Sequence, residues 1–215
     1  GPSNLHLNAS IYHLLREAML GLEHFDGALH LPNIEILGPY CLSGVQNFQT
    51  IEFDILYGLE EFALESTSFN QDLILSEKII ILSPGAFAHS RWQGKLVIHA
   101  NVDEIDASIF AGATFSVSEL EIDNVKSIGA RAFDSIFTSP LTLTLGNIER
   151  FGSFAFYNCT LTAPLVLPPT CTVIGRAAFA GITTQTLEIQ SNVQTTNSTW
   201  FDGPNSINSL ILGSS

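Results

Sequence analysis

Basic residues are scarce in this sequence. Lys and Arg together number eight among 215 residues, against 21 Asp and Glu, which gives a net charge of −13. Nucleic acids and anionic membrane surfaces are bound through basic patches, so this balance argues against both as partners. Long apolar runs are also missing, since no run approaches the about eighteen residues of a membrane-spanning helix. We therefore expect a neutral or basic partner and no direct membrane insertion by this segment.

Cysteine is scarce as well, and its three occurrences are Cys41, Cys159 and Cys171. Three cysteines cannot build a disulfide framework, and none of them stands in a C-x-x-C spacing. Cys159 and Cys171 fall at interior positions of neighbouring repeats, where a small buried side chain is favoured over a disulfide between them. The redox compartment stays open.

Signatures of metal, cofactor and catalytic sites are missing too. The six histidines show no ligand spacing such as H-x-x-x-H, and the carboxylates form no D-x-D-x-D-G calcium loop. No nucleophile–base pattern, phosphate-binding glycine loop or cofactor fingerprint is present. The glycines that do repeat, Gly129, Gly152 and Gly175, each lie four residues before a phenylalanine and indicate turn chemistry. We expect no metal, no cofactor and no enzymatic activity.

The N-terminal segment differs from the rest of the chain. Residues 1–3 are interpreted as the remnant of an expression tag. In residues 4–28, apolar side chains recur at helical spacing, namely at Ile11, Leu14, Leu15, Ala18 and Leu22. A helix with one apolar face, placed before a repeat array, is predicted to be its N-terminal cap.

What the sequence has in abundance is internal repetition. Short segments carry two large apolar side chains separated by one residue, and successive segments begin 22 to 24 residues apart. This alternation places both apolar side chains on one face of a strand. The nine pairs are Leu29/Leu31, Ile51/Phe53, Leu73/Leu75, Leu96/Ile98, Leu120/Ile122, Leu143/Leu145, Leu165/Leu167, Leu187/Ile189 and Leu210/Leu212. They predict a repeat solenoid over residues 29–215 with a parallel sheet of about nine short strands.

A bulky apolar residue, here termed the anchor, follows each of the first eight pairs: Leu42, Phe69, Phe87, Phe110, Phe133, Phe156, Phe179 and Phe201. From Phe87 onward the steps are 23, 23, 23, 23 and 22 residues, which predicts a column of stacked, buried side chains. The segment from Asp54 to Phe69 departs from this spacing, with anchor steps of 27 and 18 residues. This departure indicates either ordinary drift or a bulged loop at which a partner binds.

The repeats share further residues. The apolar pair is followed by an asparagine and an apolar residue, as in Asn124-Val125, and then by motifs such as I-G-R-A-A-F at residues 174–179 and F-G-S-F-A-F-Y-N-C at 151–159. Over residues 29–212 these features resemble the leucine-rich repeat family, and most closely its BspA-like subclass with the consensus I-G-x-x-A-F-x-x-C. An asparagine in this column is expected to turn inward and bond backbone groups at the bend.

The resemblance implies an α/β repeat solenoid, a leucine-rich-repeat horseshoe with the sheet on its concave side and short helical or irregular turns on its convex side. It also implies a surface-displayed or secreted recognition module that binds a protein or glycan on the concave face, in an extracellular or cell-surface location. The alternative is a structural element that self-associates through its open C-terminal edge. The chain stops directly after the ninth predicted strand, so a longer protein or docking on another chain is expected there.

The candidate ligand-binding residues are the middle residues of the apolar pairs and their flanks: Glu52, Asp54, Asp72, Ile74, Lys95, Val97, His99, Glu119, Glu121, Asp123 and Glu188. Three of them, Glu119, Glu121 and Asp123, lie on one strand and are termed the acidic cluster. Together with apolar residues such as Ile74 and Val97, this cluster suits a partner that carries Lys or Arg. A plain solvated face with β-branched residues chosen for strand propensity is the other interpretation.

Three N-x-S/T sequons begin at Asn8, Asn158 and Asn197. They are possible N-glycosylation sites. All three lie away from the predicted strands, so glycans at these positions would leave the concave face free.

Overall fold

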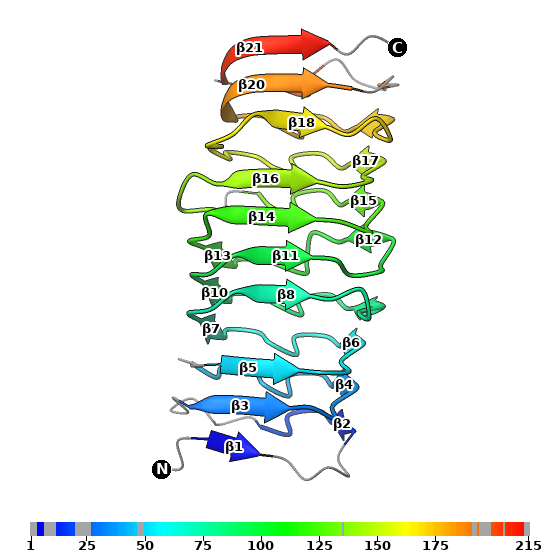
Figure 1. The fold of residues 1–215 in the computed structure, drawn as a ribbon, viewed down its shortest axis with the longest axis vertical. Helices are drawn as coiled ribbons and strands as arrows, with labels where there is room; N and C mark the ends of the chain where they lie inside the picture. The colour runs from blue at the N-terminus through cyan, green and yellow to red at the C-terminus, as the bar shows by residue number, and fades with distance from the viewer. Residues whose placement is uncertain are drawn as a thin grey trace.

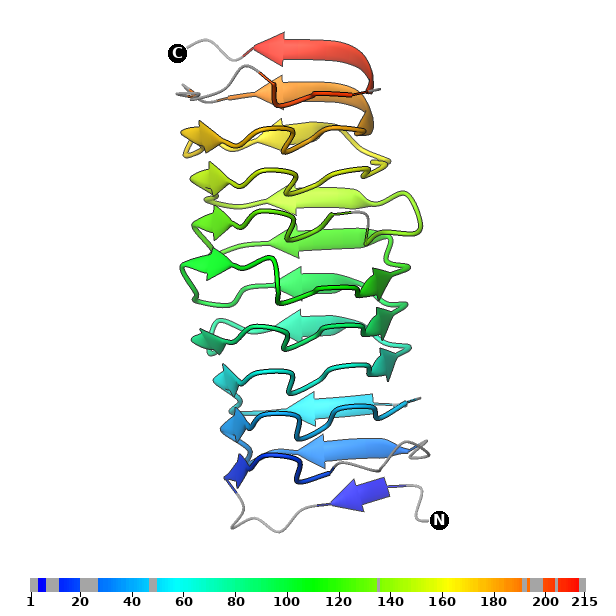
Figure 2. The same cartoon turned by 180° about the vertical axis from the view of Figure 1, so that it is seen from behind.

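The chain winds into a solenoid of stacked coils in which every strand pairing is parallel (Figure 1). This computed structural model describes residues 4–6, 12–19, 27–46, 50–134, 136–190, 193, 199–203 and 205–212. The first and last strands, β1 and β21, lie at opposite ends of the stack. Each coil contributes strands to the sides of the stack (Figure 2). The buried apolar side chains of the coils form one continuous cluster.

The side with the longest strands, termed the long-strand face, corresponds to the predicted sheet. Its strands are β1 (Asn4–His6), β3 (Ala28–Leu31), β5 (Thr50–Phe53), β8 (Leu73–Leu75), β11 (Leu96–Ile98), β14 (Glu119–Ile122), β16 (Thr142–Leu145), β18 (Leu165–Leu167), β20 (Thr183–Ile189) and β21 (Ser206–Leu212). All nine predicted pairs lie in these strands, so that part of the prediction is confirmed. The register aligns equivalent residues, since Leu96 faces Leu73 on one side and Leu120 on the other.

Two further sides carry strands of two residues each. The second side holds β2 (His13–Leu14), β4 (Ile36–Leu37), β6 (Gly58–Leu59), β9 (Ile81–Leu82), β12 (Glu104–Ile105), β15 (Ser127–Ile128), β17 (Arg150–Phe151) and β19 (Val173–Ile174). The third side holds β7 (Ser68–Phe69), β10 (Arg91–Trp92) and β13 (Thr114–Phe115). Both sets follow from the same repeat, because equivalent residues of successive coils lie side by side.

The predicted N-terminal capping helix is wrong, and so is the α/β class, because the described residues contain no helix. Instead, β1 pairs with β3 and β2 pairs with β4, so the segment forms a further coil. Leu14 and Met19 are buried, whereas Leu15 is 72% exposed. These two buried side chains are five residues apart, which is a spacing found in the repeat and not that of one helix face. Ile11 and Leu22, also assigned to the helix, lie outside the described residues.

The turns around the anchors explain why the coils contain no helices. Arg131, two residues before Phe133, has a left-handed backbone with φ of 60°. The N–H groups of Arg131 and Phe133 donate to the carbonyls of Ser153 and Ala155 in the next coil, both at 2.9 Å. An α-helix needs consecutive right-handed residues bonded four apart in the same segment. Here the backbone N–H groups of alternate residues donate to carbonyls of the next coil, so the turns stack on one another and do not form helices.

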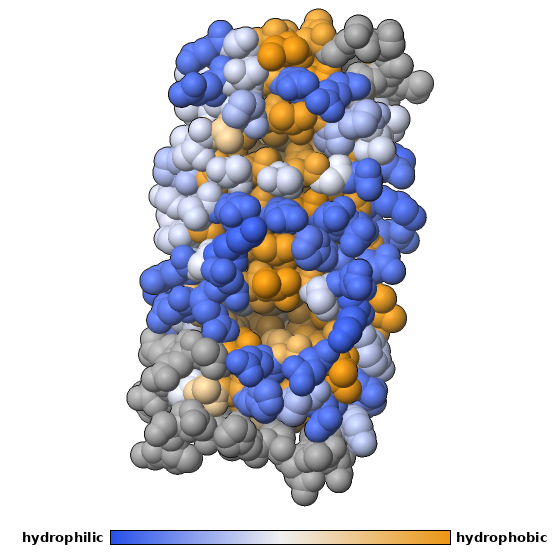
Figure 3. Space-filling view, in the orientation of Figure 1, coloured by the Kyte–Doolittle hydropathy of each residue, from blue (hydrophilic) through white to orange (hydrophobic). Residues whose placement is uncertain are grey.

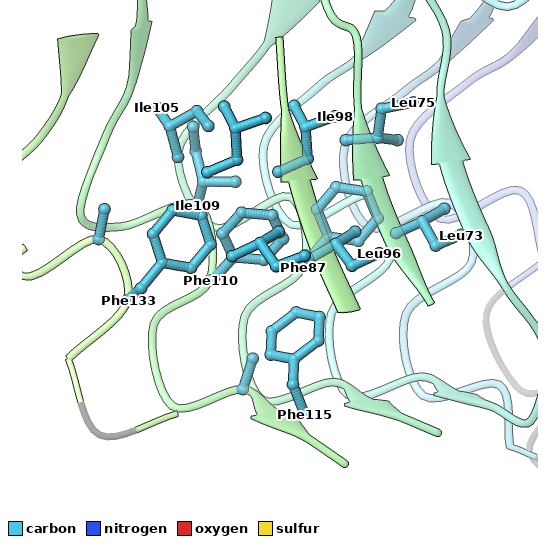
Figure 4. Packing of buried hydrophobic residues seen from close by; sticks show 14 of the residues in the cluster. Leu73, Leu75, Phe87, Leu96, Ile98, Ile105, Ile109, Phe110, Phe115 and Phe133 are labelled. Carbon is cyan, nitrogen blue, oxygen red and sulfur yellow. The ribbon is translucent and has the colours of Figure 1, made fainter. Parts of the chain in front are cut away.

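The anchor column is confirmed from Phe87 to Phe179. These side chains are buried, and the rings of neighbouring coils stack with centroid separations of 5.0 to 5.9 Å (Figure 4). Offset ring pairs add stability beyond the area that they bury. In the last predicted coil, Phe201 continues the stack at 5.9 Å from Phe179 and is partly buried.

The assignment of Phe69 to this column is wrong. The N–H of Leu64 donates to the Ala86 carbonyl at 2.9 Å, as that of Phe87 donates to Ile109 at 2.9 Å, so Leu64 is the anchor of its coil. The interval from Leu42 to Leu64 is then a normal 22 residues. Phe69 belongs to a second aromatic column on the third side, where its ring stacks on Trp92. The irregular steps between Asp54 and Phe69 therefore result from placing Phe69 in the anchor column, and the described turns here follow the regular repeat.

The repeated glycines and the repeated asparagines serve different roles from those expected from the sequence. At Gly152 and Gly175 an added Cβ would lie 2.4 Å from Ala130 N and 2.6 Å from Ser153 N of the preceding coil, so glycine is needed for close approach. The asparagine column does not turn inward, because Asn101, Asn124 and Asn147 are exposed. The Asn124 side chain bonds the His99 carbonyl from outside at 3.3 Å.

Candidate functional site

The long-strand face is interrupted between β5 and β8. The sheet β1-β3-β5 ends at β5, and a separate sheet β8-β11-β14-β16 begins at β8. The spacing between these two strands is visibly wider than between β3 and β5 or between β8 and β11 (Figures 1 and 2). On the second side, β6 pairs with both β4 and β9, so the coils stay in contact there. Among the described strands, the ladder is therefore interrupted on the long-strand face and continuous on the second side at this point.

A cavity of about 350 Å³ lies in this opening. Its deep walls are apolar side chains of both coils: Leu56, Leu59, Leu64, Leu73, Phe87 and Trp92. All six are at least nine-tenths buried. Figure 3 shows the long-strand face hollowed over an apolar strip, with hydrophilic side chains around it. This is an apolar recess that is open to solvent.

The size of the anchor changes at the cavity. Leu64 is the anchor on one side of the recess, and Phe87 is the anchor on the other. A leucine fills less space than the phenylalanine that later coils place in this column. The described side chains do not fill the larger gap between β5 and β8. Such a void is unusual, because protein interiors are otherwise closely packed.

The mouth of the cavity holds four of the predicted ligand-binding residues: Glu52, Asp54, Asp72 and Ile74. All four are exposed, and the Ile74 side chain is 62% exposed, although it is aliphatic. Glu52 accepts a bond from His30 at 2.8 Å, and Asp72 accepts one from the Lys95 backbone N–H at 2.8 Å. Exposed apolar area beside carboxylates distinguishes this region from an ordinary solvated strand.

The acidic cluster lies further along the same face, and its carboxylates are paired with basic side chains beside β11. Lys95 Nζ lies 2.9 Å from Glu119 Oε1 and 3.4 Å from Glu121 Oε2. The hydrogen bond to Glu119 raises the pKa of Lys95, and the charge of Glu121 adds to this effect. His99 lies 3.9 Å from an Asp123 carboxylate oxygen. Lys95 therefore offsets part of the negative charge that the sequence suggested for this strand.

The remaining predicted residues are dispersed. Val97 is 5% exposed, so it offers almost no surface to a ligand, despite its outward register beside Ile74. Glu188 lies on β20, remote from β5 and β8 in the stack, and accepts a bond from Gln190. Asn158 is an exposed turn residue. The sequons at Asn8 and Asn197 lie outside the described residues.

Sequence reasoning missed the walls of the cavity. Phe87 is predicted as a buried anchor, Trp92 has no predicted role, and nothing in the pattern separates a filled interior from an open one. One signal was available, namely the leucine at 64 in a column that is phenylalanine in the following coils. The assignment of Phe69 to the anchor column concealed it.

The described residues bear on three further features, namely a metal site, a disulfide and a membrane-spanning helix. Within the described ranges, no group of three or more His, Cys, Asp or Glu side chains is arranged to hold a metal ion. The three cysteines are buried and free, so the disulfide between Cys159 and Cys171 is not formed. None of the described segments is a helix long and apolar enough to span a membrane.

The fold and this face define a class of protein: a parallel-strand repeat solenoid with an open apolar recess on one sheet. The profile of the BspA type leucine-rich repeat region matches residues 27–139 and 126–215, with six copies. The chain belongs to this family, which confirms the resemblance. Among solved structures, it is similar to the pneumococcal vaccine antigen PcpA with 16% identity and a TM-score of 0.45, over 93% of this chain and 60% of that one. Comparison with curated proteins gave no match.

Proposed function

We propose that the chain is a non-catalytic recognition module of a surface-displayed or secreted protein, and that it binds a protein or glycan through its long-strand face. The cavity between β5 and β8 carries the proposal. Recesses of roughly 300–1,000 Å³ with mostly apolar walls and a few polar groups are typical ligand sites. Membership of a leucine-rich-repeat family supports a recognition role and an extracellular or cell-surface location.

The proposal is tested by a binding screen with two matched variants. A multimerised form of the chain is screened against a panel of extracellular proteins and glycans. Ile74→Arg places a bulky charge on the long-strand face, whereas Ile80→Arg makes the same change just before β9, on the second side. The two isoleucines are comparably exposed, at 62% and 56%.

The expected result is a ligand whose binding is lost in Ile74→Arg and kept in Ile80→Arg. Both variants should melt near the wild-type temperature, because exposed substitutions change stability by about 0.5 kcal/mol or less. Equal binding by both variants, or a panel without any ligand, would contradict the proposal.

A second candidate function is self-association through β21. Its Leu210, Ile211 and Leu212 side chains are 58%, 46% and 68% exposed, and among the described strands β21 pairs with β20 alone. An unpaired apolar strand edge is a template for pairing with another chain. Light scattering is expected to detect oligomers that Leu210→Lys and Leu212→Lys dissociate. A monomer at high concentration would exclude this function.

A further inference from the structure

We infer that the cavity between β5 and β8 receives a large apolar side chain from an extended, basic peptide segment of the partner. This inference rests on the proposed function and specifies its ligand. Three features of the site support it: the apolar depth of the cavity, the backbone edges on either side of it, and the charge at its mouth.

The depth of the cavity favours an apolar side chain. Leu59, Leu64, Phe87 and Trp92 line it and present carbon, and the single polar atom among their side chains, Trp92 Nε1, already donates to Ser90 at 2.6 Å. A sugar placed there would leave hydroxyl groups without partners, which is costly. A leucine or aromatic side chain would exchange water for apolar contact, which is favourable. The depth therefore selects a peptide over a glycan.

The backbone around the opening favours an extended segment. Leu73 N–H donates to Lys95 at 2.9 Å and the Leu75 carbonyl accepts from His99 at 2.8 Å, both toward β11. Alternate residues of a parallel strand bond opposite neighbours, so the backbone N–H and C=O of Ile74 face β5. No ladder forms between the described strands β5 and β8, and the Gln71 side chain donates a hydrogen bond to the Ile51 carbonyl at 3.5 Å. Open strand edges bind extended peptides through backbone hydrogen bonds.

The charge at the mouth favours a basic segment. Glu52, Asp54 and Asp72 lie there, and no Lys, Arg or His is among the described residues that line the cavity. Within the described ranges, the Asp54 carboxylate has no hydrogen bond or ion pair, while its backbone carbonyl accepts from Lys78 Nζ at 2.7 Å. Carboxylates around an apolar recess attract a partner whose Lys or Arg residues flank its apolar side chain.

The test uses linear random peptides displayed on phage as the probe. The library is selected on the wild-type chain after depletion on Leu64→Phe, which fills the cavity with the anchor residue of the later coils. The selected peptides should carry Leu, Ile, Phe or Trp next to Lys or Arg. A synthetic peptide of the selected sequence should bind Leu64→Phe more than about tenfold more weakly than wild type, as expected for loss of a central buried contact.

Two further measurements separate the causes. Asp54→Asn with Asp72→Asn should weaken binding of the same peptide and reduce its salt dependence, whereas Glu61→Gln with Glu149→Gln, at exposed carboxylates away from the long-strand face, should not. The unfolding temperature of Leu64→Phe should equal or exceed that of wild type, because the added ring enters an existing void. A lower temperature would require repeating the comparison with Leu64→Met.

The outcomes distinguish this inference from the proposed function. Undiminished peptide binding by both cavity variants overturns the inference, as does enrichment of peptides without basic residues, or no enrichment at all. A glycan or protein ligand lost in Ile74→Arg but retained in Leu64→Phe and Leu64→Met would preserve the proposed function and refute the peptide site. A screen and a selection that both fail would refute both.

Discussion

At the scale of single residues, the stacked phenylalanines are among the largest buried side chains of the coils from Phe87 onward. Phe133 is fully buried, and its ring lies 5.5 Å from that of Phe110 and 5.0 Å from that of Phe156. Removing it leaves a void among buried neighbours, which adds a cavity cost to the lost apolar contact. We expect Phe133→Ala to lower the free energy of unfolding by about 3–5 kcal/mol, measured by chemical denaturation. Thr144→Ala, at an exposed position of β16, serves as the control, and equal losses would refute the anchor assignment.

The buried thiols yield a second residue-scale prediction. Burial raises the pKa of Cys41 and Cys159 to about 12 and that of Cys171 to about 11. At pH 8 the native protein therefore holds almost no thiolate, whereas an unfolded cysteine ionises near pH 8.5. A thiol reagent such as Ellman's should label none of the three until denaturant is added. Rapid labelling of the native chain would contradict the buried placement.

The same pKa shifts set the direction of a pH dependence. A thiol whose pKa is higher in the folded state than in the unfolded state favours folding fully below the unfolded pKa. As the pH rises through about 8.5, the unfolded chain loses these protons first, and stability declines until the pH reaches the folded pKa values. Replacing the three cysteines with alanine should remove this part of the alkaline decline.

At the scale of elements, the turns depend on how closely consecutive coils approach. In Gly152→Ala, the new Cβ would lie 2.4 Å from Ala130 N, which is a backbone atom that cannot turn aside. We expect a loss of about 1–3 kcal/mol in the free energy of unfolding, as for other overpacked sites. Ser83 occupies the same column of an earlier coil, four residues before Phe87, so Ser83→Ala should be nearly neutral. Equal effects would show that close approach is not the reason for glycine.

The ion pairs of β14 with Lys95 make charge reversal in the acidic cluster a poor test of ligand binding. Replacing Glu119 and Glu121 with lysine would set two new positive charges beside Lys95, which now lies between them. Such a variant tests repulsion as well as binding. The aliphatic pair Ile74 and Ile80 avoids this problem, because neither side chain carries a charge in the wild type.

At the scale of the whole molecule, the net charge of −13 acts on association with a basic ligand. We expect the association rate constant of the selected basic peptide to fall as NaCl rises from about 0.05 M to about 0.5 M, because screening shortens the reach of the protein field. The dissociation rate should change less, since the apolar contact in the cavity is insensitive to screening. Stopped-flow measurements would separate the two rates, and a salt-independent association rate would count against a basic ligand.

The sequence by itself determined the repeat. The apolar pattern recurs every 22 to 24 residues, so the nine apolar pairs and the anchors from Phe87 onward could be assigned from the sequence alone. The family could be assigned for the same reason. The period also placed Glu52, Asp54, Asp72 and Ile74 on neighbouring strands of one face, although it did not reveal the opening that they surround.

The tertiary structure alone decided three features. Hydrogen bonds between coils, not the period of its apolar residues, make the N-terminal segment a coil and not a helix. Neighbouring coils place Leu64 in the anchor column and Phe69 in another, although both are bulky and apolar. The gap between β5 and β8 depends on how two whole coils pack against each other. No local pattern records that, because each coil by itself satisfies the repeat.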